Sequence, residues 1–217
     1  MKTIKSNGLI YCLFLIISLY SGKLNSQSLK INPELDRRVE KFLAEHSGSW
    51  HDLNVPESDG KLLYDLVLKG RYKSALEIGT STGCSGIYIA WALSKTGGKL
   101  ITIEIDERRH KTALENFRKA GLSDYIDARL ADAHSLVKEL KGPFDFVFSD
   151  ADKGWLKNYF MDIEPKLLVG GCYATHNISR GNYLQPYLEY IESLSNYEST
   201  LNTQGAGMLI SYKRSAK

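Results

Sequence analysis

The sequence of 217 residues has few of the features that mark chains without a packed core. It contains only 5 Pro, and no Gln-, Ser- or Gly-rich tract interrupts it. These absences exclude a collagen-like chain and argue against a long disordered linker. The length suits one domain of ordinary size. We therefore expect residues 27–217 to form a single domain with an N-terminal helical extension over about 27–70.

Cysteine is also scarce. The three cysteines are Cys12, Cys84 and Cys172, and the sequence has no CxxC pair or Cys/His cluster. This pattern excludes a disulfide framework and a cysteine-based structural zinc site. Cys12 falls within an N-terminal apolar run, and we expect Cys84 and Cys172 to behave as small buried hydrophobic side chains.

Beyond residue 26 the chain has no net charge. Lysine and arginine together number 28 against 25 acids, and the three lysines of the acid-free first 26 residues account for the difference. A neutral body offers no basic face for a nucleic acid. We therefore expect no nucleic-acid partner.

The N-terminal apolar run, Leu9–Tyr20, is twelve residues long. This is shorter than the roughly 20 residues that cross a bilayer. An apolar run of this length behind two lysines is typical of a signal peptide. We predict a signal peptide over residues 1–26, cleaved between Ser26 and Gln27, and hence export to the periplasm or the medium. The alternatives are an uncleaved segment that anchors the protein in a membrane, and a misassigned start that leaves it in the cytoplasm.

After two predicted helices over residues 34–46 and 56–69, short β-rich runs alternate with amphipathic runs. The five strand-helix units begin at SALEIG, KLITIEI, YIDARL, FDFVFSD and GGCYATHN. Parallel strands need helical crossovers, so this alternation predicts an α/β fold with helices on both faces of a parallel sheet. The final runs, YESTLNT and MLISYK, are joined by QGAG without a helix, which predicts an antiparallel hairpin at the sheet edge.

A glycine turn, EIGTSTG, follows the first predicted strand over Glu77–Gly83. Such a turn lets a ligand approach the backbone and the positive end of the next helix. Ser81 stands where the dinucleotide motif GxGxxG has its middle glycine, which disfavours a nicotinamide dehydrogenase. Glu104 ends the second strand, where a carboxylate can accept two hydrogen bonds from a ribose. The pair of features predicts a nucleoside ligand without a pyrophosphate.

Four polar residues follow the next two strands. Asp150 ends the fourth strand, Lys153 comes three positions later, and His176 and Asn177 end the fifth strand. Because the carboxyl ends of parallel strands share one edge, we expect these side chains to face one cavity. Asp152 is interpreted as a helix N-cap, a position that favours aspartate.

From about residue 50 to the C-terminus the chain resembles the class I S-adenosylmethionine methyltransferases. It is most similar to the small cation-dependent O-methyltransferases of the catechol and caffeoyl-CoA type. The resemblance is carried by LNVPESDGKLL, LEIGTSTGCSGIYIA, FDFVFSDADKGWLKNYF and VGGCYATHN. It implies a Rossmann-like, mostly parallel seven-stranded sheet with a C-terminal antiparallel hairpin. It also implies transfer of a methyl group from S-adenosylmethionine to a hydroxyl of a small aromatic acceptor. A homodimer is possible.

The resemblance further implies roles for single residues. Glu104 would hold the ribose of the donor, and Asp132 and Ala133 would border its adenine. The full set implied for the donor is Asn54, Val55, Glu77, Gly79, Ser81, Gly83, Ser85, Glu104, Asp132, Ala133 and Asp150.

In the family, an Asp and an Asp-Asn pair hold a divalent cation, and a Lys acts as general base. The resemblance therefore implies a cation bound by Asp150, His176 and Asn177, with Lys153 as the catalytic base. This chain has His-Asn instead of Asp-Asn. A neutral nitrogen in place of an anionic oxygen favours Mn²⁺, Co²⁺, Fe²⁺ or Zn²⁺ over Mg²⁺.

Two alternatives stay open. His176 could itself remove the hydroxyl proton without any metal, because an imidazole titrates near neutral pH. The chain could also bind the donor without turnover. Trp50, Trp155 and Tyr183 are candidates to stack on an aromatic acceptor.

Overall fold

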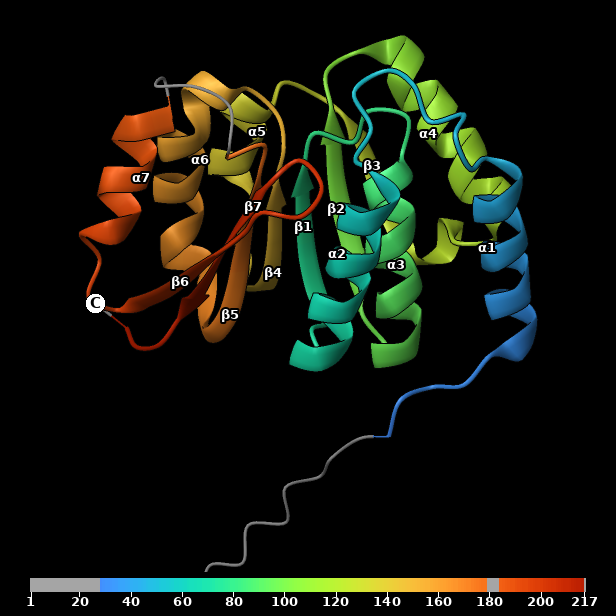
Figure 1. The fold of residues 1–217 in the computed structure, drawn as a ribbon, viewed down its shortest axis with the longest axis horizontal. Coiled ribbons are helices and arrows are strands. Elements are labelled where there is room, and N and C mark those ends of the chain that lie inside the picture. Colours follow the sequence, from blue (N-terminus) through green and yellow to red (C-terminus); the bar gives the residue numbers. More distant parts are fainter. Residues whose placement is uncertain (1–27, 179–183, 217) are drawn as a thin grey trace, which may run out of the picture.

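The computed structural model describes residues 28–178 and 184–216. Within these residues two N-terminal helices, α1 (Pro33–Glu45) and α2 (Glu57–Gly70), precede a seven-stranded sheet (Figure 1). The strands are β1 (Ser74–Ile78), β2 (Lys99–Glu104), β3 (Ile126–Leu130), β4 (Phe144–Ser149), β5 (Leu167–His176), β6 (Tyr197–Asn202) and β7 (Met208–Lys213). The helices between them are α3 (Cys84–Thr96), α4 (Glu107–Ala120), α5 (Ala133–Glu139), α6 (Leu156–Ile163) and α7 (Gln185–Glu192).

The strand order is β3-β2-β1-β4-β5-β7-β6. Strands β1 to β5 pair in parallel, whereas β7 runs antiparallel to both β5 and β6. This confirms the predicted Rossmann-like α/β fold with a C-terminal antiparallel hairpin. From β1 the sheet is extended by β2 and β3 on one side and by β4 and β5 on the other. The carboxyl ends of β1 and β4 therefore lie side by side in the middle of the sheet.

The connection from β4 to β5 differs in detail from the prediction. The alternation of strands and amphipathic runs predicts one helix between β4 and β5, but the structure has a short 3-10 turn, Lys153–Trp155, then α6, then a second 3-10 turn, Glu164–Lys166. Pro165 lies in the second turn and cannot donate an α-helical hydrogen bond, which explains the early end of α6. Strand β5 consequently begins at Leu167, three residues before the predicted strand.

Helix starts at the carboxyl edge of the sheet are fixed by aspartate caps. The side chain of Asp106 accepts a hydrogen bond from the backbone N–H of Arg109 at 2.8 Å, and Asp132 accepts one from His134 at 2.9 Å. Asp152 accepts one from Gly154 at 2.8 Å, which confirms its predicted capping role. These caps satisfy orphan N–H groups of the first turn.

The two faces of the sheet bury separate apolar layers. On β1, Leu76 and Ile78 pack with α5, α6 and α7, while Ala75 packs on the other face with α2 and α3. Figure 1 shows these two groups of helices on opposite sides of the sheet. Cys84 and Cys172 are both buried free thiols, as predicted.

The predicted signal peptide and Cys12 lie outside the described residues, so export stays a prediction. Across 28–178 and 184–216, no helix combines the length and apolar character that a bilayer crossing requires.

Phe160 of α6 stands at the centre of an aromatic group between the helices and the sheet. Its ring lies 4.9 Å from Tyr173 and 5.2 Å from Tyr197, centroid to centroid, and it is fully buried. We expect Phe160→Ala to lower the free energy of unfolding by about 3–5 kcal/mol, because it leaves a cavity that these rings cannot refill. Urea unfolding monitored by circular dichroism measures this change.

Met161→Ala is the matched control, because Met161 is the next residue of α6 and is half exposed. Its effect should stay within about 0.5 kcal/mol. Equal losses in the two variants would contradict the placement of Phe160 at the core.

Candidate active site

Two adjoining cavities lie at the carboxyl edge of the sheet. The first, here called the strand-end cavity, has a volume of about 370 Å³ and lies over the ends of β1, β2, β3 and β4. The second, here called the acidic cavity, has a volume of about 270 Å³ and lies over the ends of β4 and β5. Leu53, Asp150 and Ala151 line both. A molecule in one cavity is therefore next to a molecule in the other.

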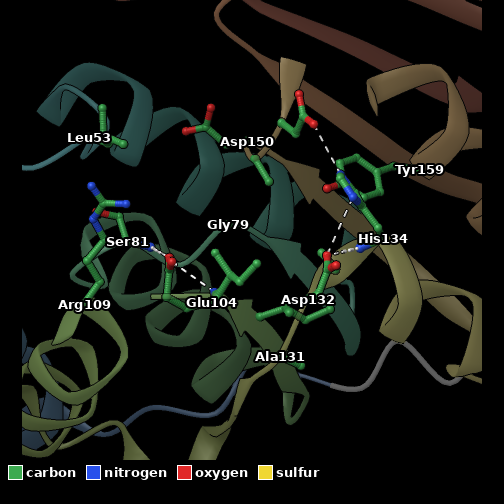
Figure 2. Close-up of a pocket in the computed structure, with 15 residues that line it drawn as sticks. Leu53, Gly79, Ser81, Glu104, Arg109, Ala131, Asp132, His134, Asp150 and Tyr159 are labelled. Carbon is green, nitrogen blue, oxygen red and sulfur yellow. Dashed lines mark hydrogen bonds and ion pairs between the residues drawn. The ribbon is translucent and has the colours of Figure 1, made fainter. Parts of the chain in front are cut away.

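Glu104 points into the strand-end cavity with its carboxylate held by the backbone (Figure 2). One oxygen accepts a hydrogen bond from the N–H of Ser81 at 2.7 Å. The other accepts from the N–H groups of Ile105 at 3.0 Å and Asp106 at 2.9 Å. Since an ionised carboxylate has about four acceptor sites, acceptor capacity remains for a ligand hydroxyl.

The glycine turn brings β1 against the end of β4. Gly79 has φ of +99°, and a Cβ there would stand 2.9 Å from the carbonyl oxygen of Asp150. Only glycine meets both conditions. The backbone N–H of Asp150 donates to the carbonyl of Ile78 at 2.8 Å, which fixes Asp150 at the wall between the cavities.

The structure gathers about half of the residues predicted for the donor in the strand-end cavity. Those that line it are Gly79, Ser81, Glu104, Asp132, Ala133 and Asp150. Asn54 instead lines the acidic cavity, where its amide donates to the hydroxyl of Thr82 at 2.7 Å. Val55 is buried close to Cys84.

Glu77, Gly83 and Ser85 do not line either cavity. Gly83 caps the start of α3, and Glu77 lies fully buried beneath the turn. Burial raises the pKa of Glu77 to about 8, against hydrogen bonds from Ser85 and Thr102 that lower it. These residues therefore support the turn from below.

Several residues that line the strand-end cavity were not predicted from the sequence. Figure 2 shows Leu53, Arg109, His134 and Tyr159 around it. Leu53 belongs to a loop with positive φ, and the neighbouring Asp52 binds Arg109 at 2.8 Å. These contacts join segments far apart in the sequence, so no local pattern indicates them.

The acidic cavity is organised by a chain of charged side chains. The amine of Lys153 contacts one carboxylate oxygen of Asp150, and the other oxygen lies 3.0 Å from Nδ1 of His176. On its opposite side, Nε2 of His176 lies 2.7 Å from a carboxylate oxygen of Asp59. The structure thus brings Asp150, Lys153 and His176 together as predicted, and adds Asp59.

The protonation of this cluster follows from its contacts. Burial alone would lower the pKa of His176, but its bonds to Asp150 and Asp59 outweigh burial, and the pKa is raised. Burial alone would raise the pKa of Asp150, but His176 and Lys153 outweigh it, and the pKa is lowered. The geometry therefore favours a protonated imidazole between two carboxylates.

Asp59 was not predicted, although the sequence carries a signal for it. It lies in the first turn of α2, where an acid is ordinary. However, Asp59, Leu63, Leu66 and Val67 share the buried face of this helix. An acid on the apolar face of an amphipathic helix is unusual and indicates a buried partner.

The predicted cation ligands meet in the acidic cavity but do not form an open donor set. Asp150 and His176 bind each other, and His176 also binds Asp59. Across the described parts of the chain, no group of three or more His, Cys, Asp or Glu side chains is arranged to hold a metal ion. As they stand, these residues do not fit a divalent cation.

Two of the aromatic residues that are candidates to stack on an acceptor, Trp50 and Trp155, line neither of the two cavities. The ring of Trp155 packs 4.5 Å from His134, and that of Trp50 lies 6.2 Å from Phe42, centroid to centroid. Neither lines the acidic cavity. Tyr183 lies outside the described residues.

Solved structures share this fold. The O-methyltransferase from Bacillus cereus, solved in complex with SAH, superposes with a TM-score of 0.73 at 26% sequence identity. The superposition covers 82% of this chain and 91% of that one. An O-methyltransferase from Klebsiella pneumoniae, described as putative, shares the fold at a TM-score of 0.71 and 24% identity, over 86% and 92% of the two chains.

Sequence comparison points the same way. Caffeoyl-CoA O-methyltransferase 1 of Eucalyptus globulus is 30% identical over 74% of this chain and 66% of its own length. Catechol O-methyltransferase of Niastella koreensis is 39% identical over half of each chain. The chain thus spans about two thirds or less of these relatives. The model of the O-methyltransferase family matches residues 25–185, which include the glycine turn, Glu104 and the Asp150–Lys153 segment, and the chain therefore belongs to that family.

Proposed function

We propose that this protein is an S-adenosylmethionine-dependent O-methyltransferase that acts on a hydroxyl of a small acceptor. The observation that carries the proposal is the shared wall of the two cavities, formed by Leu53, Asp150 and Ala151. One cavity presents a glycine turn and an oriented carboxylate, and the other presents a lysine amine. Donor and acceptor would thus meet at Asp150.

The strand-end cavity has the residues that the donor needs. Glu104 would accept hydrogen bonds from the ribose hydroxyls, because its carboxylate is oriented by three backbone N–H groups and keeps acceptor capacity. Asp132 and Ala133 would border the adenine, and Gly79 and Ser81 would lie along the methionine end. The SAH bound to the Bacillus cereus enzyme supports a ligand of this class.

The chemistry asks little of the protein beyond alignment and proton removal. S-adenosylmethionine supplies an electrophilic methyl group, whose carbon bonds to the acceptor oxygen as the carbon–sulfur bond breaks and its electron pair stays on sulfur. Lys153 in its amine form takes the hydroxyl proton, and Asp150 stabilises the ammonium that forms. Holding both reactants in adjoining cavities can lower the barrier by about 7–11 kcal/mol.

An aromatic acceptor and metal assistance are finer parts of the proposal. The names of the catechol and caffeoyl-CoA relatives support an aromatic acceptor, and the volume of about 270 Å³ favours a small one. A cation held by Asp150, His176 and Asn177 stays a prediction, which the contacts of His176 with Asp150 and Asp59 do not favour.

The direct test is incubation of the protein with S-adenosylmethionine and catechol, with mass spectrometry of the products. Methylated catechol and an equal amount of SAH are expected. Binding of the donor by calorimetry without transfer to any hydroxyl acceptor would leave the alternative, a donor-binding protein without turnover.

Removal of the Glu104 carboxylate should weaken donor binding. We expect Glu104→Ala to cost about 1.5–3 kcal/mol, since it removes charge-assisted hydrogen bonds to the ribose. The dissociation constant from calorimetry should rise about 10- to 150-fold. Glu107→Ala, at an exposed position in the first turn of α4, is the control and should bind the donor normally. Normal binding by Glu104→Ala would remove the ribose assignment.

Replacement of Lys153 should separate chemistry from donor binding. Lys153 lines the acidic cavity but not the strand-end cavity. Lys153→Met should therefore lower kcat by about 10²–10⁴-fold, the usual contribution of a general base, and leave donor affinity unchanged. Initial rates and calorimetry measure the two effects.

The matched control is Lys157→Met, an exposed position one turn further along. It should keep full activity. A Lys153→Met protein with normal kcat would show that another group takes the proton.

A further inference from the structure

We propose that the ion pair of Asp59 with His176 takes the place of a bound divalent cation in the acidic cavity, with Asp59 as a positioning residue for methyl transfer. The inference rests on the proposed function of this cavity and goes beyond it, because transfer then needs no added metal. It also assigns a role to a residue in α2, outside both cavities.

Both nitrogens of the His176 ring are already in contact with carboxylates. A histidine binds a metal ion through the lone pair of a ring nitrogen. Here both ring nitrogens face carboxylate oxygens, Nδ1 at 3.0 Å from Asp150 and Nε2 at 2.7 Å from Asp59. An ionised carboxylate only accepts hydrogen bonds, so both nitrogens must donate. Such a ring has no lone pair left for a cation.

Asp59 is held in place by the segments that surround it. Its side chain is 2% exposed, and the oxygen that faces His176 also accepts from the backbone N–H of Ala206 at 3.0 Å. The β6–β7 connection packs so closely that a Cβ on Gly205 would stand 1.8 Å from the other oxygen of Asp59. Helix α2, strand β5 and the hairpin thus converge on this carboxylate.

The charges of the cluster balance without a cation. Asp59 and Asp150 contribute two negative charges, and a doubly protonated His176 contributes one positive charge. When Lys153 takes the acceptor proton, its ammonium contributes the second, so the cluster is neutral as transfer proceeds. A divalent cation bound by a neutral His176 would instead leave one uncompensated positive charge once Lys153 is protonated, beside side chains that are 3% and 10% exposed, His176 and Asp150. Uncompensated buried charge is costly.

The role of Asp59 follows from these contacts. It lines neither cavity, so it acts through His176. The imidazole fixes one oxygen of Asp150, and the other oxygen holds the amine of Lys153 at the wall of the acidic cavity. Loss of the Asp59 charge should therefore misplace the base without affecting the donor.

The metal itself is the first test. The full chain is treated with a chelator, freed of it, and titrated calorimetrically with Mn²⁺ alone; methyl transfer to catechol is then measured with and without Mn²⁺. We expect no saturable binding and the same rate in both assays. Stoichiometric Mn²⁺ binding with metal-dependent transfer would overturn the inference while leaving the proposed function intact.

Asp59→Asn tests the positioning role, with Asp65→Asn at an exposed position of the same helix as control. Asp59→Asn should lower kcat about 10²-fold, the cost of a misplaced catalytic group, with the donor dissociation constant unchanged. The control should match the unmutated protein. A variant that loses only stability, with normal kcat per folded molecule, would assign Asp59 a purely structural role and overturn the inference.

His176→Asp provides the converse test, because it adds a third carboxylate and removes the internal positive charge. This variant should bind Mn²⁺ saturably in the same titration, and His176→Asn should not. If His176→Asp is folded by circular dichroism but binds no Mn²⁺, the claim that the Asp59–His176 ion pair takes the place of a cation is wrong. Should it fail to fold, the unmutated protein and Asp59→Asn still decide. If the protein transfers no methyl group at all, the proposed function fails, and the Mn²⁺ titration alone decides whether a cation binds.

Discussion

The parallel pairing of β1 with β4 at the reversal of strand order is the constraint on which the site depends. The crossovers from these strands leave toward opposite faces of the sheet, so a crevice opens between their carboxyl ends. Gly79 lets the two strand ends approach closely, and Asp150 then stands at the wall between both cavities. The position of every proposed group follows from that wall: Glu104 on one side of it, and Lys153 and His176 on the other.

Much of this arrangement could be predicted from sequence, because the end of a strand can be recognised where an apolar run stops. Each of Glu104, Asp150 and His176 closes a run of apolar residues, and the parallel order brings such positions to one edge. The hairpin was predictable for a similar reason, since no crossover helix separates its two strands. Local rules were weaker at Pro165, where a short 3-10 turn ends the helix and β5 starts early.

The contacts of Asp59 could not be predicted from the sequence. Its bond to His176 joins residues 117 positions apart, and its bond to Ala206 joins residues 147 apart. Neither partner can be named until the helix and the hairpin are placed against the same strand. The prediction for His176 has the same limit. A histidine is a candidate cation ligand or base by residue type, but a ring nitrogen can bind a cation or take a proton only if no other group already contacts it. In this structure the carboxylates of Asp150 and Asp59 contact the two ring nitrogens.

An internal ion pair and a bound cation both place positive charge beside Asp150, but they depend on different things. A cation must be captured from solution by deprotonated ligands, so its presence varies with pH and metal supply. The Asp59–His176 pair is part of the chain and is oriented before any reactant binds, as electrostatic stabilisation requires. Its geometry depends on the packing of α2 against the sheet, which buries Leu63 and Val67 on the same helix face as Asp59. In this protein the charge at the site is therefore a consequence of folding, because the helix that completes the core also supplies the counter-charge.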